Sequence, residues 1–240
     1  MIVLFTDFGL DGPYVGQMHA AIKAPAPELP VIDLLHTVPA FDCRAGAYLL
    51  PAYCDLFPHD AVFVCVVDPG VGGTRGALAI EADGRWFVGP DNGLFTLVAR
   101  RASSFACYEI RWRPERLCAT FHGRDLFAPV AVQLVRGDRS GLAPGEPEAT
   151  FPGWPDDLAE VIFLDTFGNA ITGLRGSVVS RDARIVVGGR QLRRATTFAD
   201  VEEGETFWYV NANGLVEIAA NRASAAATLA LRVGTRIAIS

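Results

Sequence analysis

The sequence predicts an α/β domain with a central, largely parallel sheet, followed by a smaller all-β domain. Up to residue 137, short apolar runs alternate with segments of helical spacing, which is typical of strands and crossover helices. Residues 141–155 are rich in Pro and Gly, and only short strand-like runs separated by turn residues follow. We therefore expect an α/β domain at 1–137, a linker at 138–157 and a β sandwich or barrel at 158–240.

The elements of the first domain follow from apolar spacing and turn residues. A helix is expected to begin at Pro13, because Val15, Met18 and Ile22 then share one face. Asp83-Gly84 between two apolar runs predicts a hairpin. In chain order we expect strands at 2–5, 31–35 and 61–67, hairpin strands at 77–82 and 86–89, and helices at 45–55, kinked by Pro51, and at 127–135.

The second domain is expected to consist of short strands joined by tight turns. Gly188-Gly189 and Asn213-Gly214 have the composition of such turns. The strands are expected at 161–164, 183–187, 205–210, 215–219 and 227–231.

The composition is that of a globular protein without a basic surface. Half of the 240 residues are hydrophobic, 20% are charged and the net charge is −6, so nucleic acid is not an expected partner. The five cysteines form no CxxC pair, which favours buried thiols in a reducing cytoplasm over disulfides or a zinc site. The apolar N-terminus lacks a basic flank and no run is long enough to span a bilayer, so we expect neither a signal peptide nor a membrane anchor.

The stretch from Val66 to Arg75 combines an acid, a glycine-rich loop and a cation. Asp68 follows the apolar run 61–67, so it is expected outside the carboxyl end of a strand, where ligands of open α/β sheets bind. Arg75 returns within reach of that acid. The pair is compatible with a turn clamped by an ion pair and equally with a functional site.

Three further motifs carry polar groups suited to a small ligand. His122 lies beside Gly123 directly before a helix, where an imidazole can handle protons and glycine allows close approach. Asp7 ends the first strand and suits either a ribose diol or a helix cap. The acid, ring and amide of 165–169 suit either an amino acid or a tight turn. The remaining features are the turn-like Pro90-Asp91-Asn92-Gly93, His36, which stays undecided, and His19 and His59, which receive no role.

Together these motifs resemble those of the S-adenosyl-L-methionine (SAM) hydrolases, also called SAM hydroxide adenosyltransferases, a family similar to the fluorinases and chlorinases. The matching stretches run in order through both domains. They are Thr6-Asp7-Phe8-Gly9 with Gly12-Pro13-Tyr14-Val15-Gly16, Val67-Asp68-Pro69-Gly70-Val71-Gly72 through Arg75, Pro90-Asp91-Asn92-Gly93, Thr120-Phe121-His122-Gly123-Arg124-Asp125, Asp165-Thr166-Phe167-Gly168-Asn169, and Asn213-Gly214 through Ile218-Ala219.

The resemblance implies hydrolysis of SAM to adenosine and L-methionine, by attack of water or hydroxide on ribose C5′ with the methionine thioether leaving. It also implies a homotrimer whose active sites lie between the N-terminal domain of one subunit and the C-terminal domain of the next. A sulfonium group leaves readily, so the enzyme has to orient a water in line and remove its proton. SAM is then the substrate, and neither a cofactor nor a metal is expected.

Two positions distinguish the branches that this chain resembles. The halogenases carry tyrosine at the position of Asp68, and the fluorinases carry serine at the position of Gly123. The hydrolases carry Asp, Arg and His matching Asp68, Arg75 and His122, and this chain has all three. A carboxylate would repel a halide, whereas Asp68 with His122 can hold and polarise a water. We therefore expect these three residues to activate water, with the identity of the proton acceptor left open.

The resemblance also implies substrate contacts, position by position. Asp7 is expected to hold the ribose hydroxyls, and Asp165 the methionine ammonium group. The other expected contacts are Phe41 near the ribose and methionine chain, Thr120, Phe121 and Gly123 in the motif of His122, Phe167 and Asn169 around adenosine and methionine, and Asn221 with the backbone of Arg222 near adenine. Two positions depart from the family, because Gly173 stands where Asn is frequent and Phe41 stands where the fluorinases have tryptophan.

Three other functions fit parts of the sequence. A metal-dependent hydrolase would use Asp7, Asp68, Asp91 and His122 as ligands, but Arg75 opposes a dication there and no HxH or HExxH spacing occurs. A non-catalytic SAM-binding module is the second alternative. A SAM-dependent halogenase is the third, and the carboxyl group of Asp68 argues against it.

Overall fold

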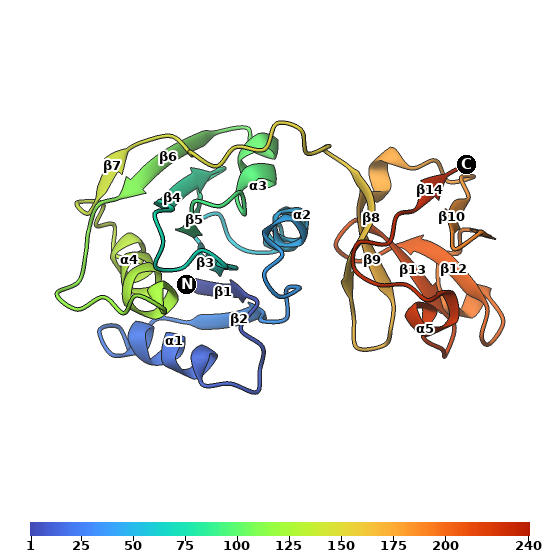
Figure 1. The fold of residues 1–240 in the computed structure, drawn as a ribbon, viewed down its shortest axis with the longest axis horizontal. Helices are drawn as coiled ribbons and strands as arrows, with labels where there is room; N and C mark the ends of the chain where they lie inside the picture. Colours follow the sequence, from blue (N-terminus) through green and yellow to red (C-terminus); the bar gives the residue numbers. More distant parts are fainter. The chain divides into compact units, whose positions relative to one another are not determined.

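The computed structural model describes all 240 residues and divides into two compact units, Met1–Phe151 and Pro152–Ser240. The first unit is α/β and the second is mostly β, which confirms the predicted fold class (Figure 1). The division falls inside the stretch expected as a linker, and the first part of that stretch adds strand β7 (Leu142–Pro144) to the first sheet. None of the helices has the length and apolar character needed to cross a bilayer.

The first unit is built on a seven-stranded mixed sheet in the order β2-β1-β3-β5-β4-β6-β7. Its other strands are β1 (Ile2–Thr6), β2 (Val31–Leu35), β3 (Val62–Val66), β4 (Ala77–Ala82), β5 (Arg85–Pro90) and β6 (Phe105–Ile110). Strands β2, β1, β3 and β5 are parallel neighbours, whereas β4, β6 and β7 are joined by antiparallel pairing. The parallel half therefore presents the carboxyl ends of its strands at one edge.

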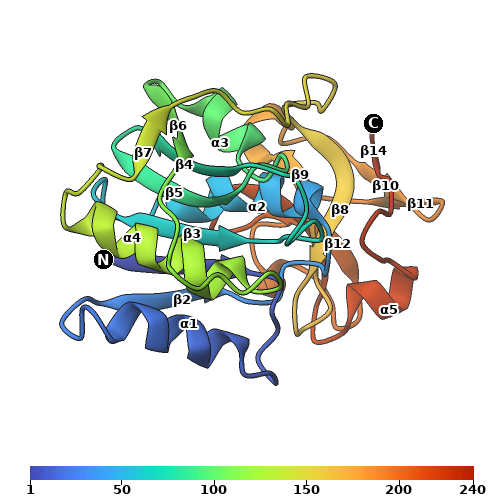
Figure 2. The same ribbon diagram turned by 60° about the vertical axis from the view of Figure 1, so that its left-hand side comes forward.

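Helices cover both faces of this sheet (Figures 1 and 2). Helices α1 (Tyr14–Lys23) and α4 (Ala128–Val135) lie on one face, and α2 (Cys43–Cys54) and α3 (Thr96–Arg101) on the other. Met18 and Ile22 of α1 are fully buried in the core formed with the sheet, as their spacing predicts. Strand β3 is buried along its whole length, which explains its continuous apolar sequence.

Two local features of the first unit follow from backbone geometry. The predicted hairpin joins β4 and β5 through Asp83 and Gly84, both at positive φ, as a two-residue turn of this kind requires. The helix expected at 127–135 is preceded by a π-helical turn, η1 (Gly123–Phe127), and the two are continuous. Such turns occur frequently at functional sites.

The second unit contains two small antiparallel sheets, in the orders β12-β13-β9-β8 and β11-β10-β14. Its elements are β8 (Leu158–Leu164), β9 (Ala170–Arg175), the short 3₁₀ turn η2 (Gly176–Val178), β10 (Ile185–Val187), β11 (Arg190–Leu192), the 3₁₀ turn η3 (Phe198–Asp200), β12 (Thr206–Val210), β13 (Leu215–Ala220), α5 (Ala225–Leu229) and β14 (Ala238–Ile239). The fully buried Trp208 and Ile218 belong to its core. The unit thus has its own hydrophobic core.

One predicted strand of the second unit is wrong. The segment 227–231 was expected to be extended, but it overlaps helix α5, whose start is capped by the Ser224 hydroxyl accepting from the backbone N–H of Ala227 at 3.1 Å. A run of alanines has high helix propensity, and the cap decides where the helix begins. Strands β9, β11 and β14 were not predicted.

Candidate active site

Polar residues follow four neighbouring strands of the first unit at the same sheet edge. Asp7 comes after β1, His36 after β2, Asp68 shortly after β3 and Asn92 after β5. These strands are parallel, so their carboxyl ends lie together, and this is the edge at which open α/β sheets bind ligands.

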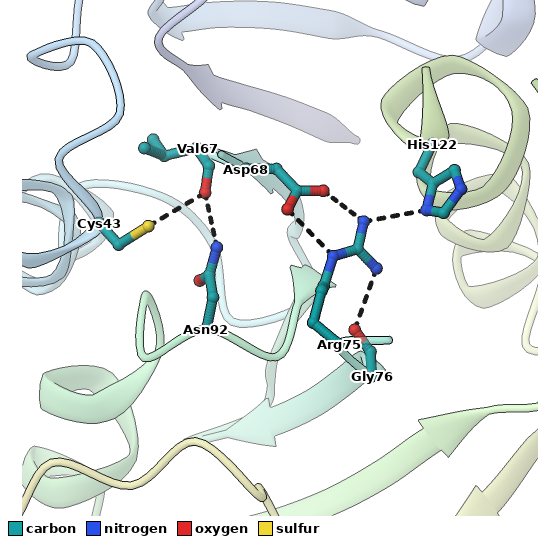
Figure 3. A network of polar contacts seen from close by, with 7 residues as sticks. All are labelled: Cys43, Val67, Asp68, Arg75, Gly76, Asn92 and His122. Carbon is teal, nitrogen blue, oxygen red and sulfur yellow. Dashed lines mark hydrogen bonds and ion pairs between the residues drawn. The ribbon is translucent and has the colours of Figure 1, made fainter. Parts of the chain in front are cut away.

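The structure brings Asp68, Arg75 and His122 into direct contact (Figure 3). The Nε of Arg75 donates to Oδ1 of Asp68 at 3.0 Å, and Nη2 donates to Oδ2. The same Nη2 lies 2.9 Å from Nδ1 of His122, and Nη1 donates to the carbonyl of Gly76 at 3.0 Å. The side chains of Asp68 and Arg75 are only 4% and 12% exposed. The guanidinium group is therefore the fixed centre of the cluster.

The contact with Arg75 determines how His122 can act. A guanidinium group only donates hydrogen bonds, so Nδ1 of His122 must accept and the proton of the neutral ring lies on Nε2. Burial, together with the charge of Arg75, lowers the pKa of His122 below its usual value. His122 is consequently a neutral donor through Nε2, while each oxygen of Asp68 keeps a lone pair beyond its bond to Arg75.

The backbone next to Asp68 is held by two further side chains. The carbonyl of Val67 accepts from Nδ2 of Asn92 at 2.8 Å and from the thiol of Cys43 at 3.4 Å (Figure 3). Burial raises the pKa of the Cys43 thiol to about 11, so it acts as a neutral donor. The sequence indicated only a turn at Asn92. Its position directly after a central strand was the signal that its side chain could also hold the backbone next to Asp68.

A cavity of about 340 Å³ opens beside this cluster. Five residues that the sequence assigned to substrate binding line it together with Asp68 and His122: Asp7, Phe41, Thr120, Phe121 and Gly123. Phe8 and Tyr14 also line it and were not predicted. Their rings pack with that of Phe121, with centroids 5.4 to 5.7 Å apart, and form an apolar wall.

Asp7 is held in this cavity by the backbone of Phe41. Its Oδ2 accepts from the N–H of Phe41 at 2.9 Å, and burial raises the pKa of the Asp7 carboxyl. Phe41 has a φ of 65° and its side chain is highly exposed. A non-glycine residue in the left-handed region is strained, and such strain concentrates at ligand sites.

A second cavity, of about 910 Å³, lies in the second unit. The predicted residues Asp165, Phe167, Asn169 and Arg222 line it. Asp165 is fixed by Asn169, whose backbone N–H donates to Oδ1 at 2.8 Å and whose Nδ2 donates to Oδ2 at 2.9 Å. Asn221 is not part of the lining, because its Nδ2 donates to the carbonyl of Val201 at 2.8 Å.

The second cavity also contains a buried carboxyl group that the sequence did not indicate. Glu217 on β13 accepts from the hydroxyl of Tyr209 at 2.6 Å and from Nδ2 of Asn211 at 2.9 Å. Burial raises the pKa of Glu217 above its usual value. Gly173, which departs from the family pattern, lies within β9 opposite Leu158 and does not line this cavity.

The carboxyl groups proposed for a metal site are bound to other partners. Asp68 is paired with Arg75, and Asp91 accepts from the backbone N–H groups of Glu148 and Ala149 at 2.7 and 3.2 Å. No group of three His, Cys, Asp or Glu side chains is placed to hold a metal ion.

Two family models match the chain, the SAM hydroxide adenosyltransferase N-terminal domain over residues 2–142 and the corresponding C-terminal domain over residues 159–238. The chain belongs to the SAM hydroxide adenosyltransferase family. This finding confirms the resemblance drawn from the sequence motifs.

Most of the curated relatives match nearly the whole of this chain. It is 42% identical to the (R)-S-adenosyl-L-methionine hydrolase of Thermus thermophilus, over 97% of this chain and 96% of the relative. The protein of that name from Salinispora arenicola is 38% identical, over 98% and 95%. The fluorinase of Nocardia brasiliensis is 25% identical, over 100% and 96%. Among solved structures, an uncharacterized conserved protein from Thermotoga maritima matches with a TM-score of 0.91 and 33% identity, over 100% and 99%.

Proposed function

We propose that this protein hydrolyses SAM to adenosine and L-methionine. The observation that carries the proposal is the Asp68 carboxylate, which lines the cavity together with His122 and is fixed by Arg75, the residue that also holds Nδ1 of His122. A water oxygen attacks ribose C5′ while the bond from C5′ to sulfur breaks. The sulfur keeps the electron pair and leaves as neutral thioether, and the water gives up one proton. Atoms and charge balance without a cofactor.

Asp68 is the proton acceptor in this proposal. The lone pair of His122 Nδ1 is engaged by Arg75, so the ring can donate to the water but cannot take its proton in this arrangement. Asp68 still offers a lone pair on each oxygen. In this proposal Asp68 orients the water in line with the leaving group, and such orientation supplies much of the rate enhancement.

The substrate contacts are proposed on the residues that line the two cavities. Asp7 holds the ribose hydroxyls beside Phe41, Thr120, Phe121 and Gly123. Asp165 binds the methionine ammonium group, and Phe167 and Asn169 enclose the ligand. The backbone of Arg222 contacts adenine, and Asn221, which lies outside the lining, holds this backbone near adenine through the bond from its Nδ2 to the carbonyl of Val201. Each of these groups has the hydrogen-bonding or apolar character that its proposed partner requires.

The configuration of the substrate is part of the proposal. The names of the similar hydrolases specify (R)-SAM, and the L prefix already describes the amino acid carbon, so the descriptor refers to the sulfonium centre. We propose the same epimer for this chain. Incubation with a mixture of the two sulfonium epimers, resolved by chromatography, should deplete the R epimer and leave the S epimer.

We further propose a homotrimer in the cytoplasm. The five cysteines are free, and burial raises the pKa of the Cys54 thiol to about 11, which suits a reducing compartment. The proposed substrate groups are distributed over two separate units, as a site shared between subunits requires. Light scattering at working concentration should give three times the chain mass, and a monomer would contradict the shared site.

The reaction is tested by incubation with SAM in water enriched in oxygen-18. Adenosine and methionine should form in equal amounts, with the label at the 5′-oxygen of adenosine. Label-free adenosine would contradict attack of water at C5′. Parallel reactions with a chelator should proceed unchanged if no metal takes part, and reactions with chloride or fluoride should yield no halogenated nucleoside. No turnover by a folded trimer that binds SAM would favour the non-catalytic SAM-binding module.

A further inference from the structure

We infer that His36 is a positioning residue for the cavity of the first unit, acting through the Thr6 hydroxyl on the backbone that carries Asp7. The inference rests on the proposed function of that cavity. His36 lines neither cavity and touches none of the proposed catalytic groups. Its effect on the reaction is therefore indirect.

A continuous hydrogen-bond chain joins His36 to the cavity loop. Its Nε2 lies 3.1 Å from Oδ1 of Asp33, and its Nδ1 lies 2.8 Å from the Thr6 hydroxyl. The Thr6 hydroxyl in turn accepts from the backbone N–H of Phe8 at 3.2 Å. Thr6 is fully buried and His36 is 3% exposed, so water does not compete for the bond between these two side chains.

For a neutral imidazole, the direction of each bond in this chain follows from the charge of Asp33. Burial raises the pKa of Asp33, but the hydrogen bonds from His19 and His36 outweigh it and hold that pKa below its usual value. The ionised carboxyl can only accept, so Nε2 of His36 carries a proton. Nδ1 of the neutral ring then accepts from the Thr6 hydroxyl. That hydroxyl has a lone pair left for the N–H of Phe8.

The chain fixes the backbone on both sides of Asp7. The Thr6 hydroxyl holds Phe8, and the carbonyl of His36 accepts from the N–H of Gly9 at 2.7 Å. Gly9 has a φ of +71°, where a glycine turns the chain without strain. Asp7 and Phe8 therefore lie between Thr6, which is bonded to the His36 ring, and Gly9, which is bonded to the His36 carbonyl, and both line the cavity. His36 thus sets the position of a loop that contributes two side chains to the site.

The same carboxyl group ties the network to helix α1. Nε2 of His19 lies 2.7 Å from Oδ1 of Asp33, the oxygen that His36 also contacts. Helix α1 begins at Tyr14, another residue of the cavity wall. Asp33 is half-exposed on β2, so it can be substituted without opening the core.

Thr6→Val tests the inference, because valine keeps the shape of threonine and removes only the hydroxyl. Thr6→Ser is the matched control, because it keeps the hydroxyl and loses only the methyl group. Loss of one buried hydrogen bond to the loop should weaken adenosine binding and raise KM for SAM on the order of tenfold in Thr6→Val, with kcat changed less than about threefold. Calorimetric titration with adenosine measures the affinity directly. Thr6→Ser should stay within about twofold of the wild type on both readouts.

A double variant distinguishes an effect carried by the hydrogen-bond chain from an effect of altered packing at Thr6. Asp33→Ala should weaken adenosine binding in the same direction, and Thr6→Val with Asp33→Ala should lose no more than Thr6→Val alone, because both act on one chain. Unchanged adenosine affinity in Thr6→Val, an equal loss in Thr6→Ser, or additive losses would overturn the inference. Absence of SAM hydrolysis by the wild type would instead contradict the proposed function, and the titrations with adenosine would still report on the loop.

Discussion

Asp68 is the residue on which the proposed chemistry depends, because it lines the cavity and is the one acceptor of the cluster with lone pairs beyond its bonds to Arg75. Asp68→Asn keeps the shape of the side chain and one acceptor for Arg75 but removes the base. We expect kcat to fall on the order of a hundredfold or more, as for loss of a general base, with adenosine affinity changed less than about threefold. Steady-state kinetics and titration with adenosine measure the two effects.

The matched control for this substitution is Asp60→Asn, at an exposed position of the same unit. It removes the same charge from the protein but not from the cavity, and it should leave kcat and adenosine affinity unchanged. Full turnover in Asp68→Asn would assign the proton to another acceptor.

His122 should make the protein less stable in mild acid. Its pKa is lowered in the folded state, so the unfolded chain binds the proton more readily, and stability is lost as pH falls through the usual histidine pKa of about 6.5. Protonation would place a second cation against Arg75. Replacement by asparagine removes this contribution, so the fall in Tm between pH 7.5 and pH 5.5 should be smaller in His122→Asn than in the wild type. An equal fall in Tm in both proteins would show that protonation of His122 does not cause the loss of stability.

At the scale of elements, strand ends and tight turns were predictable from the sequence. The apolar run before Asp68 forms β3, and Asp83-Gly84 makes the expected hairpin, because both signals are local. The π-helical turn after His122 was not predictable. In this turn the backbone N–H of Ala128 donates to the carbonyl of Gly123. Five residues are too few for the spacing of side chains to distinguish a π-helical turn from an α-helix.

Glu217 shows why part of the second cavity could not be predicted from the sequence either. A charged residue in the alternating pattern of a strand is usually solvent-exposed, yet Glu217 is 4% exposed. Its burial depends on Tyr209, which lies directly opposite on β12 and donates to it. Such a pair becomes visible only when the strand register is known.

The contact between the loop of Gly72 and the segment before His122 can be tested by substitution. Gly72 has a φ of +78°, and an added Cβ would lie 2.5 Å from the carbonyl oxygen of Ala119. Gly72→Ala should therefore displace this segment and move His122 away from Arg75. We expect kcat/KM to fall on the order of tenfold, because small displacements of catalytic groups are costly.

Gly204→Ala is the control for backbone strain. Gly204 has a φ of +79°, but an added Cβ would meet nothing within 4 Å. Gly204→Ala should lose roughly 1 kcal/mol of unfolding free energy, since an L-residue is strained at this φ, and Gly72→Ala should lose more because its Cβ also meets the carbonyl of Ala119. Only Gly72→Ala should lose activity. Equal activity in the two variants would show that the loop contact does not position His122.

At the scale of the whole molecule, the proposed site requires groups from both units, and the homotrimer proposal assigns them to different subunits. Asp68→Asn inactivates the first unit, and Asp165→Ala removes the proposed ammonium contact from the second. In a trimer with shared sites, a site that combines the intact units of the two variants is active. Random mixing of equal amounts should therefore restore about a quarter of wild-type activity, as the head-to-tail symmetry of a closed ring dictates. Co-expression with two different tags, followed by tandem purification and mass measurement, isolates the mixed trimers, which should have about a third of wild-type activity because one junction in three combines the two intact units. Activity no higher than that of either variant alone would mean that each site uses both units of one chain.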